Sequence, residues 1–588
     1  MRSRIIGFIM MVMLGLPALA SADGLGFVRI SLLEGDVQIR TEETGEWAPA
    51  ALNTPLREGD SIWTPDNARV EIQFRDGTVV RLDERTAVDI FAAEEDAQQF
   101  RVETGRLYVK TGRNTEQFLE LEIPQGLLKV YNSARFRVDV PADDSQRVSV
   151  FRGVVHVEGR AAKTQVKTGE VLTVEGSRAD LITASPRPDE WDRWNTRRDD
   201  KLERRYVSSR YVPGELEPYT ADLDDNGEWL YERDYGYVWR PRVVAVDWSP
   251  YRVGRWVWIG GDYVWISHEN WGWAPYHYGR WVHTPYRGWC WVPPVRGDVY
   301  WSPGYVAWVN TPTYIGWVPL APGEVYYGRG YYGRHSANIT QVNITINKTV
   351  VKNYRNINVT NAVTVVEKDS FATGKPRHVK VKENIFVSRE VSYGRPEVKP
   401  RGRDAYAPAV KTVNADKLPP ERIRRRPVEE LKERREKRKE EIRVVREERK
   451  RDRQEQRSEQ KIEKREEKEQ RKDDRLDRTE RRRDLREQNK LEKREEKEQR
   501  REKRQEGARP ERTEDGVRGF QREEAPPADA DHGNRGRRPV RSFERSAEGQ
   551  DSPPAEGDKK QHEPKREKKK VKIERREGER EEKRKDKD

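Results

Sequence analysis

Residues 70–82 read VEIQFRDGTVVRL, and this stretch decides the fold class of the N-terminal part of the chain. Apolar and polar residues alternate on both sides of Asp76 and Gly77, which is typical of two antiparallel strands joined by a tight turn. The same alternation, punctuated by further glycine–aspartate turns, continues through residues 27–181. No window long enough for a substantial helix shows a 3.6-residue period. We therefore expect an all-β module at 27–181, built as a sandwich, a roll or a short solenoid.

Short motifs follow one another in a fixed order through this module. They are GDV at 35–37, LREGD at 56–60, DGT at 76–78, GRLYV at 105–109, IPQG at 123–126, ARFRV at 134–138, VSVFRGVV at 148–155 and KTGEVL at 167–172. In this order they resemble the FecR domain family. Its founding members sense occupied iron transporters in the periplasm and signal to a sigma factor, with a cytoplasmic segment and a membrane helix ahead of the domain. This chain has only a signal-peptide pattern there, so the resemblance implies an extracytoplasmic β-module for protein interaction, of roll-like or solenoid-like form and without catalytic residues.

The N-terminus has the layout of a secretory signal peptide. Arg2 and Arg4 precede an apolar run from Ile5 to Leu19, which ends in the small residues ASA at 20–22. A basic start, an apolar middle and small residues at the cut are typical of exported proteins, and the run is short for a membrane anchor. We expect residues 1–22 to be removed and the mature chain to be periplasmic or extracellular.

The remaining sequence argues against other attachments to the membrane. No later stretch is apolar enough to cross a bilayer, so no transmembrane helix is expected in the mature chain. The single cysteine, Cys290, lies far from the cut. A lipoprotein and an intrachain disulfide framework are therefore not expected.

Charge is distributed unevenly along the chain. Of the 588 residues 37% are charged, with a formal net charge of +13. Aromatic residues concentrate in the first 335 residues, whereas charge dominates after about residue 400. The net positive charge of an exported protein favours acidic partners, such as an envelope protein or an acidic cell-wall or surface polymer.

A block of tryptophans defines a second module, which we place at 219–333. Between Trp229 and Trp317 lie 14 of the 18 tryptophans, and the stretch WSPYRVGRW at 248–256 recurs as WAPYHYGRW at 273–281. Each unit predicts a short strand pair. In the first, strands at 254–259 and 263–266 are joined by a turn at Gly260, Gly261 and Asp262. We therefore expect a small β-domain built by repetition. The block resembles a tryptophan-rich bacterial domain of unknown function that accompanies FecR-like modules.

The tryptophans allow two interpretations, a core and a binding surface. Most rings are expected in the core, but exposed aromatic faces beside arginines suit sugar rings, basic groups or peptides. The candidate ligand-binding residues are Tyr251, Arg255, Trp256, Trp258, Trp265, Tyr276, Arg280 and Trp281.

Catalytic and metal motifs are not found. DLDDNG at 222–227 matches the start of a calcium loop, but Arg233 stands at the twelfth position, where an EF-hand needs glutamate. His268, His277 and His283 lack the close pairing of a zinc site. We therefore predict no catalytic residue, no metal and no cofactor, and expect Cys290 to be buried.

The rest of the chain divides by composition into linkers, a β-prone segment, a helix and a tail. Residues 182–218 and 401–427 are predicted linkers, and the Asn-, Thr- and Val-rich segment 334–400 is β-prone. Residues 428–506 contain neither proline nor glycine and are bracketed by both, so we predict one long charged helix. Its apolar residues are too sparse for a coiled coil. Residues 507–588 are predicted to be a disordered tail.

Three functions remain open at this point. The first is a non-enzymatic envelope interaction or scaffold protein that binds proteins through its FecR-like module. The second is a glycan- or cell-wall-binding protein that uses the tryptophan block, and the third is a FecR-type sensor in extracytoplasmic signalling. Nucleic-acid binding by the charged helix is the lesser alternative, because acids are interleaved with the bases. The oligomeric state stays open.

Overall fold

The computed structural model describes residues 25–94, 97–112, 118–142, 145–159, 163–176, 178–182, 187–340, 346–381 and 383–506. The predicted signal peptide and the predicted disordered tail lie outside these residues. The chain divides into two compact units, Met1–Asp473 and Asp474–Asp588. None of the helices in the described ranges has the length and apolar character that a membrane span requires.

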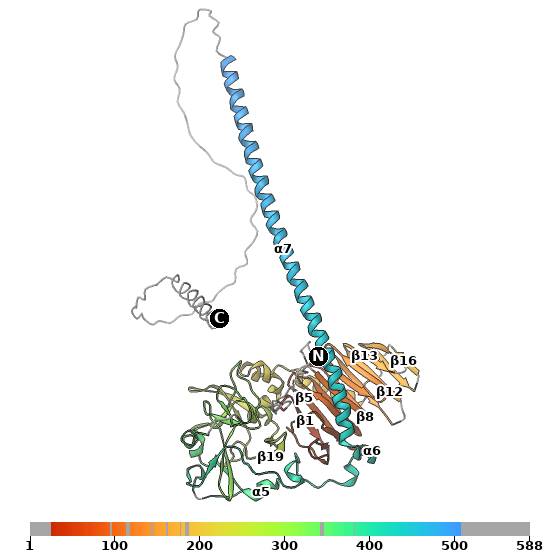
Figure 1. The fold of residues 1–588 in the computed structure, drawn as a ribbon, viewed down its shortest axis with the longest axis vertical. Coiled ribbons are helices and arrows are strands. Elements are labelled where there is room, and N and C mark those ends of the chain that lie inside the picture. Colours follow the sequence, from red (N-terminus) through yellow and green to blue (C-terminus); the bar gives the residue numbers. More distant parts are fainter. Residues whose placement is uncertain are drawn as a thin grey trace, which may run out of the picture. The chain divides into compact units, whose positions relative to one another are not determined.

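The first module is all β, as predicted. Its described strands are β1 (Val28–Glu34), β2 (Gln38–Arg40), β3 (Trp47–Pro49), β4 (Ser61–Thr64), β5 (Arg69–Phe74), β6 (Val79–Leu82), β7 (Thr86–Ala93), β8 (Ala97–Lys110), β9 (Phe118–Ile123), β10 (Gly126–Val130), β11 (Arg135–Val140), β12 (Ser145–Arg152), β13 (Val154–Gly159), β14 (Lys163–Lys167), β15 (Val171–Glu175) and β16 (Arg178–Ile182). They are red to orange in Figure 1.

The long strand β8 joins two parts of this sheet. Its first part pairs with β7 and, in parallel, with β9, whereas its second part pairs with β6 and β11. We call β1, β5, β6, β11, β12, β15 and β16 with the second part of β8 sheet A, and the remaining strands with its first part sheet B. Gly105 lies where the partners change, with φ of +105°, and a Cβ there would lie 2.4 Å from the Thr86 Cα. Only glycine permits this close crossing.

Aliphatic side chains from both sheets form one core. Val70, Ile72 and Phe74 of β5 are buried in it, which confirms the alternation read from residues 70–82. The described strands form neither a closed barrel nor a solenoid of stacked repeats, because they pair into one sheet that changes direction at β8. The solenoid-like alternative is thus not the arrangement found.

Residues 182–218, predicted to be a linker, contain regular structure. Helix α1 (Glu190–Glu203) begins with a capping box, in which Asp189 accepts from the Asp192 backbone and Asp192 accepts from the Asp189 backbone. The 3₁₀ turns η1 (Val207–Arg210) and η2 (Gly214–Tyr219) follow. This segment is ordered because its charged side chains pair with the polar side of sheet A.

The tryptophan-rich module is a set of small sheets around an aromatic core. Its elements up to residue 333 are α2 (Thr220–Asn226), β17 (Gly227–Glu232), β18 (Gly236–Pro241), β19 (Gly254–Ile259), β20 (Asp262–Ser267), α3 (Trp273–His277), β21 (Arg280–Thr284), β22 (Gly288–Val292), β23 (Val306–Asn310), β24 (Tyr314–Pro319) and β25 (Tyr326–Gly328). The predicted hairpin over 254–266 is confirmed as β19 and β20, which turn at Gly260 and Gly261. The two repeat copies differ before their Gly-Arg-Trp strands, since only the second copy forms a helix, α3.

The β-prone segment 334–400 completes this module. It contains β26 (Ser336–Asn338), α4 (Lys348–Lys352), η3 (Arg355–Asn358), β27 (Thr364–Glu367), α5 (Lys368–Ala372), η4 (Ile385–Val387) and β28 (Ser392–Tyr393). Strands β27 and β28 flank β24 and β23 in one four-stranded sheet, and Phe371 and Phe386 join the aromatic core. The tryptophan block and this segment therefore share one core.

The last described part begins with short turns and ends in one long helix. Residues 401–427 contain η5 (Arg403–Ala405), η6 (Ala415–Lys417) and α6 (Glu421–Arg424). The predicted charged helix is confirmed as α7 (Val428–Glu506), shown in blue in Figure 1. Leu476, Leu485 and Leu491 are exposed on it.

Candidate functional site

The predicted ligand-binding aromatic residues form the centre of a core. Tyr251, Tyr276, Trp265, Trp281 and Trp256 are between 0% and 6% exposed. Tyr251 stacks on Trp256 with ring centroids 6.0 Å apart, and its hydroxyl donates to the Tyr276 carbonyl at 2.7 Å. These five residues therefore offer no free ring face to a sugar, which corrects their assignment as a binding platform. Aromatic rings make up much of this core, beside aliphatic residues such as Ile315, Val318 and Leu320.

The other three candidates also contact their own chain. Arg255, 7% exposed, donates from Nη2 to the carbonyls of Gly374, at 2.9 Å, and Asp404. The Arg280 guanidinium lies 3.6 Å from the centroid of the Tyr305 ring. Trp258 is half-buried, with the Arg395 guanidinium 5.1 Å from its ring. Only Arg280 and Trp258 keep partial exposure.

The acidic side chains of the run 222–227 pair with neighbouring parts of the chain. Asp222 accepts from Arg29 at 2.5 Å, Asp224 accepts from the Ser208 backbone at 3.0 Å, and Asp225 pairs with Lys201 at 2.5 Å. Among the described residues, no three His, Cys, Asp or Glu side chains are grouped so as to hold a metal ion.

Cys290 is buried, as predicted. It lies against Val238 and Val282. Burial raises the pKa of its thiol to about 11, so the thiol is protonated at neutral pH.

The polar side of sheet A binds helix α1 through a buried charge network, which we define as Glu71, Arg81, Tyr108, Arg198 and Asp199. Arg81 pairs with Glu71 and with Asp199, both at 2.8 Å. Arg198 pairs with Glu71 at 2.7 Å, and the Tyr108 hydroxyl donates to Asp199 at 2.6 Å. Burial alone would raise the pKa of Glu71, but Arg81 and Arg198 hold it well below its usual range.

The polar side of sheet B binds a different segment. We call Glu42, Glu58, Asp89, Glu103, Glu120 and Glu122 the acidic face, and residues 421–439 the basic segment. Arg426 pairs with Asp89 at 2.6 Å and with Glu103 at 3.0 Å. Arg435 pairs with Glu42 at 2.6 Å, Arg438 with Glu122 at 3.6 Å, and Lys439 with Glu58.

One apolar contact anchors the basic segment to the module. Ile423 of α6 is 1% exposed and packs with Trp47, Trp63 and Ala87. The predicted linker 401–427 is therefore docked on the β-module, because this apolar anchor and the ion pairs hold its end.

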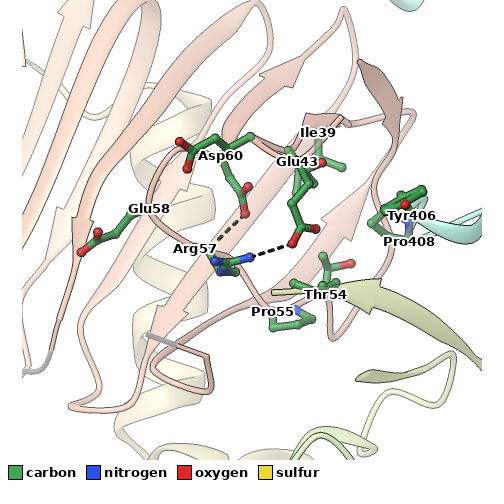
Figure 2. Close-up of a pocket in the computed structure, with 12 residues that line it drawn as sticks. Ile39, Glu43, Thr54, Pro55, Arg57, Glu58, Asp60, Tyr406 and Pro408 are labelled. Atoms are coloured by element: carbon green, nitrogen blue, oxygen red, sulfur yellow. Dashed lines mark hydrogen bonds and ion pairs between the residues drawn. The ribbon is translucent and has the colours of Figure 1, made fainter. Parts of the chain in front are cut away.

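A small cavity of about 100 Å³ lies where the two modules and residues 406–408 meet (Figure 2). Arg57 occupies its centre, with its guanidinium 3.2 Å from Glu43 and its backbone N–H donating to Asp60 at 2.8 Å. Asp60 is buried, and this burial raises the pKa of its carboxyl to about 7. Glu43 also accepts from the backbone of Gly260 at 2.5 Å, so the cavity is a junction between the β-module and the β19–β20 hairpin.

A much larger cleft, of about 930 Å³, lies between the β-module and the segment that leads to the tryptophan-rich module. One wall comes from the turn after β5, the end of β8 and the start of β11, and the other comes from the end of α1 and from η2. We call it the η2 cleft. The sequence did not predict this cleft, because one of its walls belongs to the segment predicted to be a linker. The charged residues at the end of α1 are the one feature of the sequence that points to it.

Comparison with known families agrees with the two resemblances read from the sequence. Residues 60–156 match the family described as FecR protein, and residues 220–324 match a family of unknown function, DUF6600. Comparison with curated proteins gives no match.

Two solved structures are also similar to part of the chain. Both are described as a "putative anti-sigma factor" from Parabacteroides distasonis, at 1.65 and 2.50 Å resolution. Their identities are 22% and 21%, each with a TM-score of 0.19, and each match covers 21% of this chain and 57% of that protein. The chain thus spans little more than half of the proteins that it matches.

The two family matches fall on the two modules that the structure separates by their cores. FecR proteins are associated with the cell envelope, so the match supports an envelope- or signalling-related role at that coarse level. The chain carries a FecR domain followed by a tryptophan-rich domain of a family of unknown function.

Proposed function

We propose that this protein is an exported, non-enzymatic interaction protein of the bacterial envelope, and that its FecR module binds protein segments. One observation carries the proposal. The module already binds two segments of its own chain, α1 on sheet A and the basic segment on sheet B. Both are helical, and both are held by charged side chains on the outer side of a sheet.

The way in which these helices are bound supports a role in recognition. Arginine–carboxylate pairs have a defined geometry, so they select a partner and its register. On sheet B, the apolar anchor Ile423 is followed three residues later by Arg426, which pairs with Asp89 and Glu103. A sheet that selects helices in this way can serve as a scaffold module.

The tryptophan-rich domain has a supporting role in this proposal. Most of its tryptophan rings are buried in the core, and its surface contacts the FecR module at the junction of Gly260 and Glu43. A glycan platform built from Trp256, Trp265 and Trp281 is therefore not part of the proposal.

Photo-cross-linking in intact cells tests the proposal. We would place a photoreactive residue at the exposed Val154 of the FecR module in the full chain, and a matched one at the exposed Tyr286 of the tryptophan-rich domain. We expect mass spectrometry to identify one or a few envelope proteins captured from position 154 and not from position 286. Capture of cell-wall or polysaccharide fragments alone, from either position, would contradict the proposal.

The FecR match also favours a second candidate, a sensory role in extracytoplasmic signalling. This role predicts that loss of the chain changes transcription controlled by a sigma factor. Transcript profiling of cells with and without the chain would distinguish the candidates, because a pure scaffold leaves such transcripts unchanged.

A further inference from the structure

The η2 cleft is large enough for a ligand of considerable size. Its volume of about 930 Å³ lies at the upper end of the range of about 300–1,000 Å³ that is typical of ligand pockets. Gly77, Gly112 and Gly214 are among its lining residues, so backbone groups are accessible along it. A Cβ at Gly214 would meet nothing within 4 Å, which shows how open the rim is there.

Several charges in the cleft are already paired within the chain. Glu203 pairs with Lys110 at 2.9 Å and with Arg135 at 2.8 Å. Glu217 accepts from the Ser209 hydroxyl at 2.7 Å, and Asp76 accepts from the Thr78 hydroxyl at 2.6 Å. Glu203 is thus neutralised by two bases, whereas Asp76 and Glu217 keep their negative charge because their hydroxyl partners are neutral.

Three arginines of the lining have no such partner. Arg75, Arg152 and Arg204 make no ion pair with any residue in the described part of the chain, and of these Arg152 and Arg204 are exposed. Arg75 is half-buried, with its guanidinium 5.9 Å from the centroid of the Phe27 ring. Glu215 is the one acid that opposes them without a contact of its own among these residues. With five bases (Arg75, Lys110, Arg135, Arg152 and Arg204) against four acids (Asp76, Glu203, Glu215 and Glu217), the lining carries a small excess of positive charge, and its unpaired cations are arginines.

We propose that the η2 cleft binds an acidic, extended segment of a partner protein. This inference rests on the proposed function, protein binding by the FecR module, and names the η2 cleft as the place where the partner binds. Guanidinium groups bind carboxylates through two parallel hydrogen bonds, so three arginines suit a segment with several acidic side chains. The described lining contains no aromatic ring, whereas sugars are commonly recognised by stacking on one. Ala134, Leu202 and Pro218 add apolar wall for a peptide backbone and its side chains.

The test uses the mature full chain and a fluorescent peptide of alternating glutamate and alanine that carries a photoreactive group. Binding is measured by fluorescence anisotropy at physiological salt, and the cross-linked position is found by mass spectrometry. The variants are R75Q/R152Q/R204Q and R152Q/R204Q, the second of which spares the half-buried Arg75. The control, R465Q/R481Q/R494Q, removes the same charge from exposed positions on α7.

We expect the triple cleft variant to bind the peptide at least about tenfold more weakly, and the double variant to show a smaller loss. The control should stay close to wild type, and the cross-links should fall on lining residues such as Arg152 or Glu215. Equal losses in cleft and control variants, or cross-links on α7, would show a non-specific polyelectrolyte effect and overturn the inference.

The cellular experiment separates this inference from the function on which it rests. If position 154 captures an envelope protein but the acidic peptide does not bind the cleft, the inference is wrong and the proposed function stands. If the peptide binds the cleft but no protein is captured in cells, the proposed function fails although the cleft has the predicted chemistry.

Discussion

The two polar sides of the FecR module bind helices of the same chain, but only on sheet B does part of the contact lie exposed to water. On sheet A, Glu71, Arg81 and Asp199 are at most 1% exposed, so the centre of the buried charge network is shielded from water. On sheet B, Arg426 and Arg435 are also buried, at 7% and 9% exposed, but the side chains of Arg434, Arg438 and Lys439 remain between 24% and 45% exposed. The stability lost on removing one partner of an ion pair therefore differs between the two sides, because it depends on how deeply the pair is buried.

The charges are also arranged differently on the two sides. On sheet A each partner carries both signs, since Glu71 and Arg81 lie on strands and Arg198 and Asp199 lie on α1. On sheet B most acids lie on the β-module and most bases on the basic segment, although Arg101 of β8 also pairs with Glu103 and Glu122. Mixed signs fix one register, whereas separated signs attract over a longer range and are screened by salt. The comparison predicts a rigid contact on sheet A and a salt-sensitive contact on sheet B.

The largest effect is expected from Arg81→Met, which leaves Glu71 and Asp199 buried with less compensation. Breaking a buried pair by removing one partner typically costs about 3–5 kcal/mol, and we expect a loss of that order here. Urea denaturation of the mature chain measures it. The matched control is Arg178→Met, whose pair with Asp180 is exposed and should contribute little. Similar stabilities of the two variants would contradict the depth difference.

A second prediction compares two buried carboxyls of the module. Glu71 contacts two arginines, whereas Asp60 accepts a backbone N–H from Arg57 and its pKa is raised to about 7 by burial. A raised pKa in the folded state means that stability is complete below the ordinary pKa and is lost as the pH rises through about 7. We expect wild type to be less stable at pH 8 than at pH 5, with Asp60 responsible for a part on the order of 2–4 kcal/mol.

Asp60→Asn should remove that part of the pH dependence, because the amide oxygen can still accept from Arg57 and cannot ionise. The measurement is the free energy of unfolding of both proteins at the two pH values. Glu71 provides the contrast, since its lowered pKa means that its contribution is present above the ordinary pKa and is lost on acidification. An unchanged pH dependence in Asp60→Asn would show that Asp60 is ionised in the folded protein.

The elements of the fold were largely predictable from local patterns. Alternation over 70–82 predicted β5 and β6, and the proline and glycine that bracket 428–506 predicted the bounds of α7. The β19–β20 hairpin followed from its paired glycines. These patterns depend only on residues close in sequence, so they can be interpreted without knowledge of the tertiary structure.

The contacts between elements were not predictable in the same way. Alternation shows that Glu71 and Arg81 lie on the polar side of a sheet, but it does not show whether water or a helix covers that side. For this reason 182–218 and 401–427 were predicted as linkers, although both pack on the FecR module. For the tryptophans the error is the opposite one: rings considered as an exposed binding surface are buried. Aromatic rings suit a core and a binding surface equally well, so the sequence does not distinguish the two. The η2 cleft depends on a contact between segments far apart in sequence.

A smaller effect is expected from Tyr108→Phe, which removes one hydrogen bond from the network and keeps its ring. The Tyr108 hydroxyl donates to Asp199 at 2.6 Å, and hydrogen bonds to charged groups contribute about 1.5–3 kcal/mol. We expect a loss near the lower value, since Arg81 still pairs with Asp199. Urea denaturation measures the loss, and Tyr286→Phe, at an exposed tyrosine, is the control. A loss as large as that of Arg81→Met would mean that the hydroxyl, and not the guanidinium, organises the network.

The smallest effect is expected on sheet B, from Arg434→Gln with Arg438→Gln. Both arginines are partly exposed and lie 3.6 Å from Glu122, so together they should contribute about 1 kcal/mol or less at low salt. Salt at about 0.5 M should remove most of that difference, because the Debye length is then shorter than at physiological salt. Hydrogen exchange of the first turns of α7 measures it, with R465Q/R494Q on the exposed helix as the control. If exchange in wild type is insensitive to salt, the basic segment is held by Ile423 and Arg426 alone, and the long-range attraction inferred for the acidic face is wrong.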